Sequence, residues 1–247
     1  MEKTLLEVKN LSVCVEGKQI LNNLNLNIKS GQIHAIMGPN GSGKSTFSYS
    51  LIGHPKYQIS SGQFMFYGQD ITRLPVDKKA KNGIFLAFQY PYEIEGLSLR
   101  NFLRQSYNSL YSGTEKELSF EEFNAYLVEK TQDLKINSDF LQRGVNFGFS
   151  GGEKKKAEIL QLAVLEPKLA VLDEIDSGLD VDSLRVVCES IKKVKLNNPS
   201  MSLLIITHYP RILHFLEPDF VHILKKGSIV ESGNKALATT IENEGYK

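Results

Sequence analysis

The sequence predicts an α/β protein built on a mainly parallel β-sheet with helices on both sides, and three observations support this. An apolar strand at 33–37 runs into a glycine-rich loop and then a helix at 45–52. From residue 151 to 216, predicted helices and strands alternate, which favours a parallel sheet with crossover helices. Residues 5–28 instead alternate apolar and polar side chains, as expected for antiparallel strands with one buried face.

The N-terminal elements follow from this alternation. Strands at 5–9 and 11–15 are followed by a turn at Glu16-Gly17 and a strand over 20–28, and Ser30-Gly31 then breaks the pattern. The next strands are predicted over 63–67, where apolar and polar residues alternate, and over 83–88, where nearly every residue is apolar. A run of the second kind is typical of a strand buried on both faces.

The central part of the chain predicts a helical insertion. Apolar residues recur at helical spacing over 98–111 and 119–134, with a loop at 112–114. We interpret residues 93–165 as a helical subdomain and residues 1–92 and 166–247 as the β subdomain plus core, so that 1–247 is one domain. The remaining expected elements are helix 151–165, strand 169–173, helix 180–195, strand 202–206, helix 209–216 and a hairpin at Lys226-Gly227.

The composition excludes several classes of protein. Lys and Arg total 29 against 28 Asp and Glu, and this balance argues against a nucleic-acid partner. No apolar run approaches the ~20 residues that span a bilayer, and the N-terminus resembles no signal or transit peptide. Cys14 and Cys188 form no C-x-x-C pair, which favours small apolar roles in a reducing compartment. We expect a cytoplasmic protein without membrane insertion, or a stromal one if it is plastid-encoded.

The segment 38–46 matches the phosphate-loop pattern G-x-x-x-x-G-K-[ST] between a predicted strand and a helix. Glycines let successive N–H groups face an anion, while the helix N-terminus and Lys44 add positive charge. A glycine-rich turn without a ligand is the alternative, and the flanking strand and helix argue against it. The predicted nucleotide-binding residues are Gly38, Pro39, Asn40, Gly41, Ser42, Gly43, Lys44, Ser45 and Thr46, with the Ser45 hydroxyl at a Mg²⁺ ion.

Two carboxylates follow the buried strand 169–173. Asp173 at its end can face the phosphate-loop magnesium, and Glu174 can orient or polarise an attacking water. Many strands end in acidic loops, so this pattern alone leaves a purely structural role open.

Ser150, Gly151, Gly152 and Glu153 start a predicted helix. Ser150 and Glu153 have the spacing of a capping box. Each glycine in the first turn costs roughly 1 kcal/mol relative to alanine, so a second reason for the pair is needed. Close approach of an anion to the helix N-terminus supplies one.

In their order along the chain, these motifs resemble those of ABC-type ATPases. Gln89 resembles the Q-loop residue, Ser177 to Asp180 the D-loop, and Thr207-His208 the H-loop. The resemblance implies a P-loop parallel-sheet core, an antiparallel β subdomain and an inserted helical subdomain, with ATP and Mg²⁺ as cofactors. It assigns catalysis to Glu174, His208 and Lys44, metal contact to Ser45, Gln89 and Asp173, and the D-loop to Asp180.

The resemblance also implies a dimer. One chain would supply the phosphate loop, and a second copy would complete the site with Ser150, Gly151, Gly152 and Glu153 in trans. Two bound ATP molecules would then hold a two-fold dimer together until hydrolysis releases it.

Two segments are similar to the SufC family, the ATPases of Suf iron–sulfur cluster assembly. Residues 88–96 read FQYPYEIEG and residues 149–161 read FSGGEKKKAEILQ, with Glu153 where transporter ATPases usually have glutamine. The resemblance extends through LDEIDSGLD and THYPRIL and implies SufB and SufD type scaffold proteins as partners. The main alternative is the nucleotide-binding subunit of a membrane transporter. A binding module with an inactive site is disfavoured, because Lys44, Asp173, Glu174 and His208 are all present.

Two further sites are predicted less directly. Val15 stands where ABC ATPases often place an aromatic that stacks on adenine, so we expect weak selection of ATP over GTP. An aromatic-rich segment follows Gln89 and is predicted to dock the partner, because aromatics are enriched at interfaces. This docking surface comprises Tyr90, Tyr92, Ile94 and Arg100. Packing of Tyr90 and Ile94 against the core is the alternative.

Overall fold

The computed structural model describes residues 3–246, which form two compact units. The first contains residues 3–88, 168–176 and 199–246, and the second contains residues 89–167 and 177–198. The second unit therefore includes a helical segment that lies between two strands of the first in sequence. Within residues 3–246, no helix is both long enough and apolar enough to cross a membrane.

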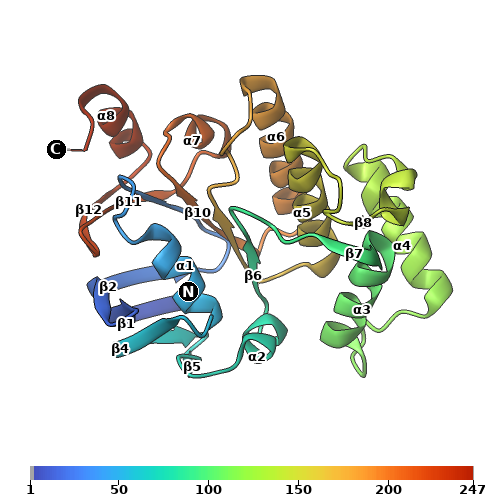
Figure 1. Ribbon diagram of the computed structural model, residues 1–247, viewed down its shortest axis with the longest axis horizontal. Helices are drawn as coiled ribbons and strands as arrows, with labels where there is room; N and C mark the ends of the chain where they lie inside the picture. The colour runs from blue at the N-terminus through green and yellow to red at the C-terminus, as the bar shows by residue number, and fades with distance from the viewer. Residues whose placement is uncertain (1–2, 247) are drawn as a thin grey trace. The chain divides into compact units, whose positions relative to one another are not determined.

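A six-stranded sheet forms the centre of the first unit, and all its strands except the edge strand β12 run parallel (Figure 1). Residues of β9 and β10 are buried at every position, which explains their uninterrupted apolar runs. In sheet order the strands are β12 (Ser228–Gly233), β11 (Phe220–Lys225), β3 (Ile33–Met37), β10 (Ser202–Thr207), β9 (Leu169–Asp173) and β6 (Ile84–Ala87).

The register of this sheet brings three functional loops to one edge. Thr207 at the end of β10 lies opposite Met37 of β3, and its neighbour Ile206 lies opposite Asp173 of β9. Since these strands are parallel, the loops that follow their carboxyl ends meet, as ligand-binding loops do in open α/β sheets. Those loops contain the phosphate loop, Glu174 and His208.

The second sheet of this unit is antiparallel, as predicted. Its strands, in sheet order, are β2 (Lys18–Lys29), β1 (Thr4–Val15), β4 (Tyr57–Phe66) and β5 (Gln69–Asp70). The predicted turn is confirmed, with positive φ at both Glu16 and Gly17. The strand predicted over 63–67 begins earlier, at Tyr57. Most of residues 57–62 are exposed. The sequence there therefore lacks the clear alternation of apolar and polar residues that would predict a strand with one buried face.

Four helices belong to the first unit. The phosphate-loop helix α1 ends where predicted, before Gly53, which caps it with φ 84°. Helices α2 and α8 were not predicted. Helix α2 is very short, and the sequence of α8, ALATTIENE, lacks a clear apolar period. The helices are α1 (Lys44–Ile52), α2 (Val76–Lys81), α7 (Arg211–Leu216) and α8 (Ala236–Glu244).

The second unit is mainly helical, and its predicted helices are confirmed. Helices α3, α4 and α5 are labelled in Figure 1. They pack on a shared apolar core that includes Leu103, Phe123 and Leu160. A short two-stranded ladder in this unit was not predicted. The elements are β7 (Ile94–Ser98), α3 (Leu99–Tyr111), α4 (Phe120–Asp133), the 3₁₀ helix η1 (Ser138–Gln142), β8 (Gly144–Val145), α5 (Gly151–Leu165) and α6 (Val181–Asn197).

Candidate functional site

The phosphate loop connects β3 to α1, and packing enforces glycine at both of its ends. A Cβ on Gly38 would lie 2.1 Å from the carbonyl oxygen of Leu224, so no side chain fits there. Gly43 has φ 109°, and a Cβ would lie 2.6 Å from a methyl carbon of Leu21. Helix α1 has no side-chain cap and no acidic residue in its first turn, so its N-terminal dipole is available to an anion.

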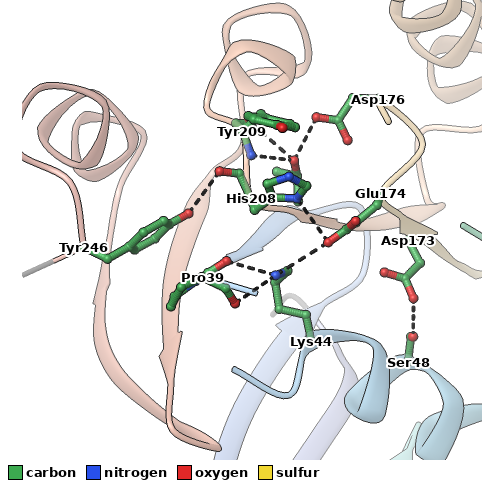
Figure 2. A network of polar contacts seen from close by, with 11 residues as sticks. Pro39, Lys44, Ser48, Asp173, Glu174, Asp176, His208, Tyr209 and Tyr246 are labelled. Carbon is green, nitrogen blue, oxygen red and sulfur yellow. Dashed lines mark hydrogen bonds and ion pairs between the residues drawn. The ribbon is translucent and has the colours of Figure 1, made fainter. Parts of the chain in front are cut away.

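Lys44 is held inside the loop that precedes it. Its buried ammonium donates to the carbonyl oxygens of Gly38 (2.9 Å) and Pro39 (3.2 Å) (Figure 2). The same nitrogen lies 3.5 Å from a carboxylate oxygen of Glu174. The positive charge is therefore fixed at the mouth of the loop, where a phosphate group would meet it.

Asp173 ends β9 beside the phosphate-loop helix. Its Oδ2 accepts a hydrogen bond from Ser48 of α1 at 2.7 Å, while its buried Oδ1 has no hydrogen-bond partner among the described residues. Burial raises the pKa of this carboxyl to about 6, although the Ser48 hydrogen bond acts in the opposite direction. The hydroxyl of Ser45 also acts on this pKa as a hydrogen-bond donor.

These groups fit a Mg²⁺ ion. A hard cation prefers oxygen ligands, and a carboxylate oxygen without a partner gains most from one. Among the described residues, no cluster of three His, Cys, Asp or Glu side chains forms a complete metal cage. One or two protein oxygens are nevertheless what Mg²⁺ uses when substrate phosphates and water supply the rest.

Glu174 and His208 face each other across the ends of β9 and β10. The imidazole Nδ1 of His208 lies 3.2 Å from Oε1 of Glu174, the same oxygen that faces Lys44 (Figure 2). Glu174 has φ 47°, and its N–H donates to the carbonyl of Ile206 at 2.8 Å. This left-handed backbone turns the carboxylate out of the strand direction toward Lys44 and His208.

Sequence reasoning missed a second layer that holds these groups. Asp176 is buried, and its Oδ2 accepts a hydrogen bond from Thr207 Oγ1 at 2.8 Å. Thr207 Oγ1 in turn accepts from the N–H of Tyr209 at 3.0 Å, which fixes the turn that carries His208. Burial raises the pKa of Asp176. Its place within the acidic run LDEID was the one sequence signal for it.

The segment at the start of α5 lies in the second unit. Ser150 and Glu153 form the predicted capping box, with hydrogen bonds in both directions. Glu153 also pairs with Arg143, and this contact, followed by the Ser150 backbone hydrogen bond, lowers the pKa of Glu153 to about 2. A Cβ on Gly151 or Gly152 would meet no atom of the described residues within 4 Å. The backbone here is open to a ligand or to another molecule.

The remaining predicted residues have distinct surroundings. Gln89 is the first residue of the second unit and is partly buried. Asp180 caps α6, where its carboxylate accepts from Ser183 N–H at 2.7 Å. Val15 ends β1, partly buried and opposite Tyr57 of β4.

The predicted docking residues divide into two groups. Tyr90 and Tyr92 are each 77% exposed, and Ile94 is also exposed. Arg100 is partly buried instead, and its guanidinium donates to Asn124 at 3.0 Å. The tyrosines are thus available to a partner, whereas Arg100 is already engaged within the unit.

Neither cysteine of the described residues forms a disulfide. Cys188 is buried, as predicted for a small apolar residue, whereas Cys14 is only partly buried.

Comparison with known proteins places these features in a family. A family model described as ABC transporter matches residues 21–177. A probable ATP-dependent transporter of Synechocystis sp. is 51% identical over 100% of this chain and 96% of its own length. Another probable ATP-dependent transporter, from Cyanophora paradoxa, is 49% identical over 99% of this chain and 95% of its own length.

A solved structure confirms the predicted fold class. A dimeric ATP-binding cassette in a post-hydrolysis state, bound to ADP and Pi, superposes with a TM-score of 0.78. It is 23% identical and covers 94% of this chain and 99% of that chain, so it supports the fold alone. Together with the family match over residues 21–177, the near full-length relatives show that this chain belongs to the ABC transporter family, as an ATP-binding cassette.

Proposed function

We propose that the chain hydrolyses ATP in a site completed by a second copy, and that hydrolysis drives a conformational change in a scaffold for iron–sulfur cluster assembly. The convergence of Lys44, Glu174 and His208 at one edge of the sheet carries the hydrolytic part of this proposal. Each comes from a different loop, so their meeting is a product of the fold.

The nucleotide phosphates would lie in the loop 38–46. Backbone N–H groups and the α1 dipole attract the phosphates, and Lys44 supplies a full positive charge. Ser45 and Asp173 would hold Mg²⁺, with Gln89 as a further contact. When bound, this ion supplies charge that offsets the negative phosphate oxygens.

Glu174 would act as the general base. As the oxygen of a water molecule bonds to the γ-phosphorus, the bond from that phosphorus to the bridging oxygen of ADP breaks. The water proton passes to the Glu174 carboxylate, and the products are ADP and phosphate. Lys44 stabilises the charge that develops on the transferring group, and His208 positions that group while contacting Glu174.

The second copy would contribute the α5 segment. Its open glycine backbone and helix N-terminus suit a negatively charged group that approaches from outside. If the α5 segment of each copy meets the nucleotide held by the other copy, the result is a closed two-fold dimer. A cassette of the same fold is dimeric with ADP and phosphate, and we propose the same kind of assembly for this chain by analogy.

The scaffold partner is inferred from the segments at 88–96 and 149–161, which resemble SufC. We therefore propose proteins of the SufB and SufD type as partners. A transporter function is the second candidate, because curated relatives are described as probable ATP-dependent transporters.

Co-purification distinguishes the two. Tagged protein isolated from its native source should bring down soluble SufB and SufD type scaffolds, identified by mass spectrometry. Recovery of membrane permease subunits without scaffolds would contradict the scaffold proposal and favour the transporter.

We propose Tyr90, Tyr92 and Ile94 as the centre of the docking surface. They are exposed, and their segment is fixed to the rest of the unit. Asn146 donates to the carbonyl of Tyr92 at 2.9 Å, and the neighbouring Glu93 pairs with Lys154 of α5 at 2.7 Å. A partner bound here would therefore act on α5, the helix that begins at Gly151.

Pull-down of the scaffold tests this surface. Tyr92→Ala should weaken binding strongly, and Arg100→Glu more weakly because that side chain already contacts Asn124. Phe120→Ala is the matched control, since Phe120 is an exposed aromatic on α4 of the same unit. Undiminished scaffold binding by Tyr92→Ala would favour the alternative, in which Tyr90 and Ile94 pack against the core and do not dock a partner.

For the adenine, Val15 offers apolar contact but no aromatic ring. Because stacking adds roughly 0.5–1.5 kcal/mol, we expect ATP to bind less than about tenfold more tightly than GTP. Competition binding measures this ratio.

A further inference from the structure

The C-terminal end of the described chain returns to the functional site. After α8, the hydroxyl of Tyr246 donates to the carbonyl oxygen of His208 at 3.3 Å, and the side chain is half-buried (Figure 2). No motif in the sequence pointed to this residue. Its contact is with the backbone of the residue whose imidazole faces Glu174.

A glycine aims Tyr246 at this carbonyl. Gly245 caps α8 with φ 74° and ψ −176°, a conformation that is essentially restricted to glycine. A Cβ there would meet no described atom within 4 Å, so the requirement for glycine is conformational rather than steric. The chain thus uses a special backbone geometry at the one position that turns Tyr246 back toward the site.

The backbone at the start of the phosphate loop also acts on the pKa of this hydroxyl. Burial raises the pKa of Tyr246, and a hydrogen bond from the backbone of Gly38 acts in the opposite direction. Gly38 is closely packed against the backbone of Leu224, which leaves no room for a side chain. Its carbonyl also accepts from Lys44. Tyr246 therefore contacts the turn that holds His208, and its pKa also responds to the backbone of the loop that holds Lys44.

We propose that Tyr246 is a positioning residue, whose hydroxyl holds the backbone carbonyl of His208 so that the imidazole faces Glu174. This inference rests on the proposed ATP hydrolysis. Without the hydroxyl, the carbonyl of His208 loses its hydrogen bond from Tyr246. The hydrogen bond from the N–H of Tyr209 to Thr207 remains. The imidazole then samples orientations in which it no longer faces Glu174.

Tyr246→Phe isolates the hydroxyl, because the ring and its burial are retained. We expect kcat for ATP to fall about five- to tenfold, as for loss of one neutral hydrogen bond, with KM for MgATP within about twofold of wild type. Gly245→Ala should change kcat in the same direction, because alanine does not adopt this backbone conformation readily. Tyr67→Phe is the matched control, since the Tyr67 hydroxyl also makes one hydrogen bond, to Ser30 at 3.0 Å, just beyond the ends of two strands of the antiparallel sheet.

An unchanged kcat in Tyr246→Phe would overturn the proposal. So would an equal fall of kcat in Tyr67→Phe, or a fall of kcat in Tyr246→Phe that comes with a matching rise in KM. If the wild-type protein does not hydrolyse ATP, the proposed function is contradicted rather than the role of Tyr246. NMR then tests that role independently of turnover. The imidazole NMR resonances of His208, assigned with His208→Gln, should shift in Tyr246→Phe and stay in place in Tyr67→Phe. Resonances that do not move would overturn the positioning role whether or not the protein hydrolyses ATP.

Discussion

The phosphate loop and the start of α5 both present a helix N-terminus, but their surroundings differ. At the phosphate loop, Lys44 is buried and already hydrogen-bonded, with Glu174 in reach. At the start of α5, the Gly151 and Gly152 backbone is open, and the nearby charges of Glu153 and Arg143 neutralise each other. The first is thus a preorganised anion site, whereas the second has the features of a surface that completes a site on another molecule.

Removing the buried cation should have the largest effect. Lys44→Ala deletes the charge that faces the phosphates, so turnover should fall on the order of 10³-fold, as for loss of a key transition-state donor. ATP affinity should fall about 10- to 100-fold. Phosphate release and equilibrium binding measure the two effects, with exposed Lys56→Ala as the control. Wild-type turnover in Lys44→Ala would mean that the loop is not the hydrolytic site.

Blocking the open helix end tests the other half of the comparison. Gly151→Leu should leave ATP binding by the single chain intact but reduce turnover about 100-fold, because the side chain would occupy the space needed by the second copy's nucleotide. The fold should not suffer, since leucine is favoured over glycine in a helix by roughly 1 kcal/mol. A normal turnover, or a lowered melting temperature, would contradict this interpretation.

Acid should weaken the metal-binding side of the phosphate site. Because burial raises the pKa of Asp173 to about 6, this carboxyl becomes protonated below that pH and would no longer bind the Mg²⁺ ion proposed for this site. Turnover should therefore fall about tenfold per pH unit below pH 6, and excess Mg²⁺ should move the midpoint to lower pH. A profile that is flat from pH 7 to pH 5, or insensitive to Mg²⁺, would contradict this.

A smaller effect on stability is expected away from both helix ends. His34 and His222 are buried and hydrogen-bonded to each other at 2.9 Å. Burial lowers their pKa to about 3 and about 4, with the neighbouring His222 a further cause for His34. The unfolded chain therefore binds more protons below pH 6.5, and the free energy of unfolding decreases as pH falls from there.

Each histidine would account for up to about 2 kcal/mol between pH 6.5 and pH 5. Urea denaturation at both pH values measures this loss, and His222→Gln should reduce it. An equal loss in the variant would show that other groups are responsible.

The sequence was sufficient for the parts whose chemistry is local. A strand, a glycine loop and a lysine at fixed spacing define the phosphate site, and Ser150 with Glu153 defines a cap. It was insufficient where a contact depends on tertiary packing. Ser48 and Asp173 are far apart in sequence, as are Thr207 and Asp176. The parallel pairing of β9 with β10 brings the second pair together, and the packing of α1 beside β9 brings the first. Helix α8 lacks an apolar period, so the return of Tyr246 could not be foreseen.

The most direct test of the central claim is the mass of Glu174→Gln in solution with MgATP. Glutamine keeps the shape of the side chain but cannot accept the proton from water, so ATP should stay bound and intact. Light scattering of Glu174→Gln with MgATP should then report twice the mass of one chain. With ADP in place of ATP, or in the double variant that also carries Gly151→Leu, it should report the mass of a single chain. A single-chain mass with ATP bound, or hydrolysis at the wild-type rate, would contradict a site shared between two copies.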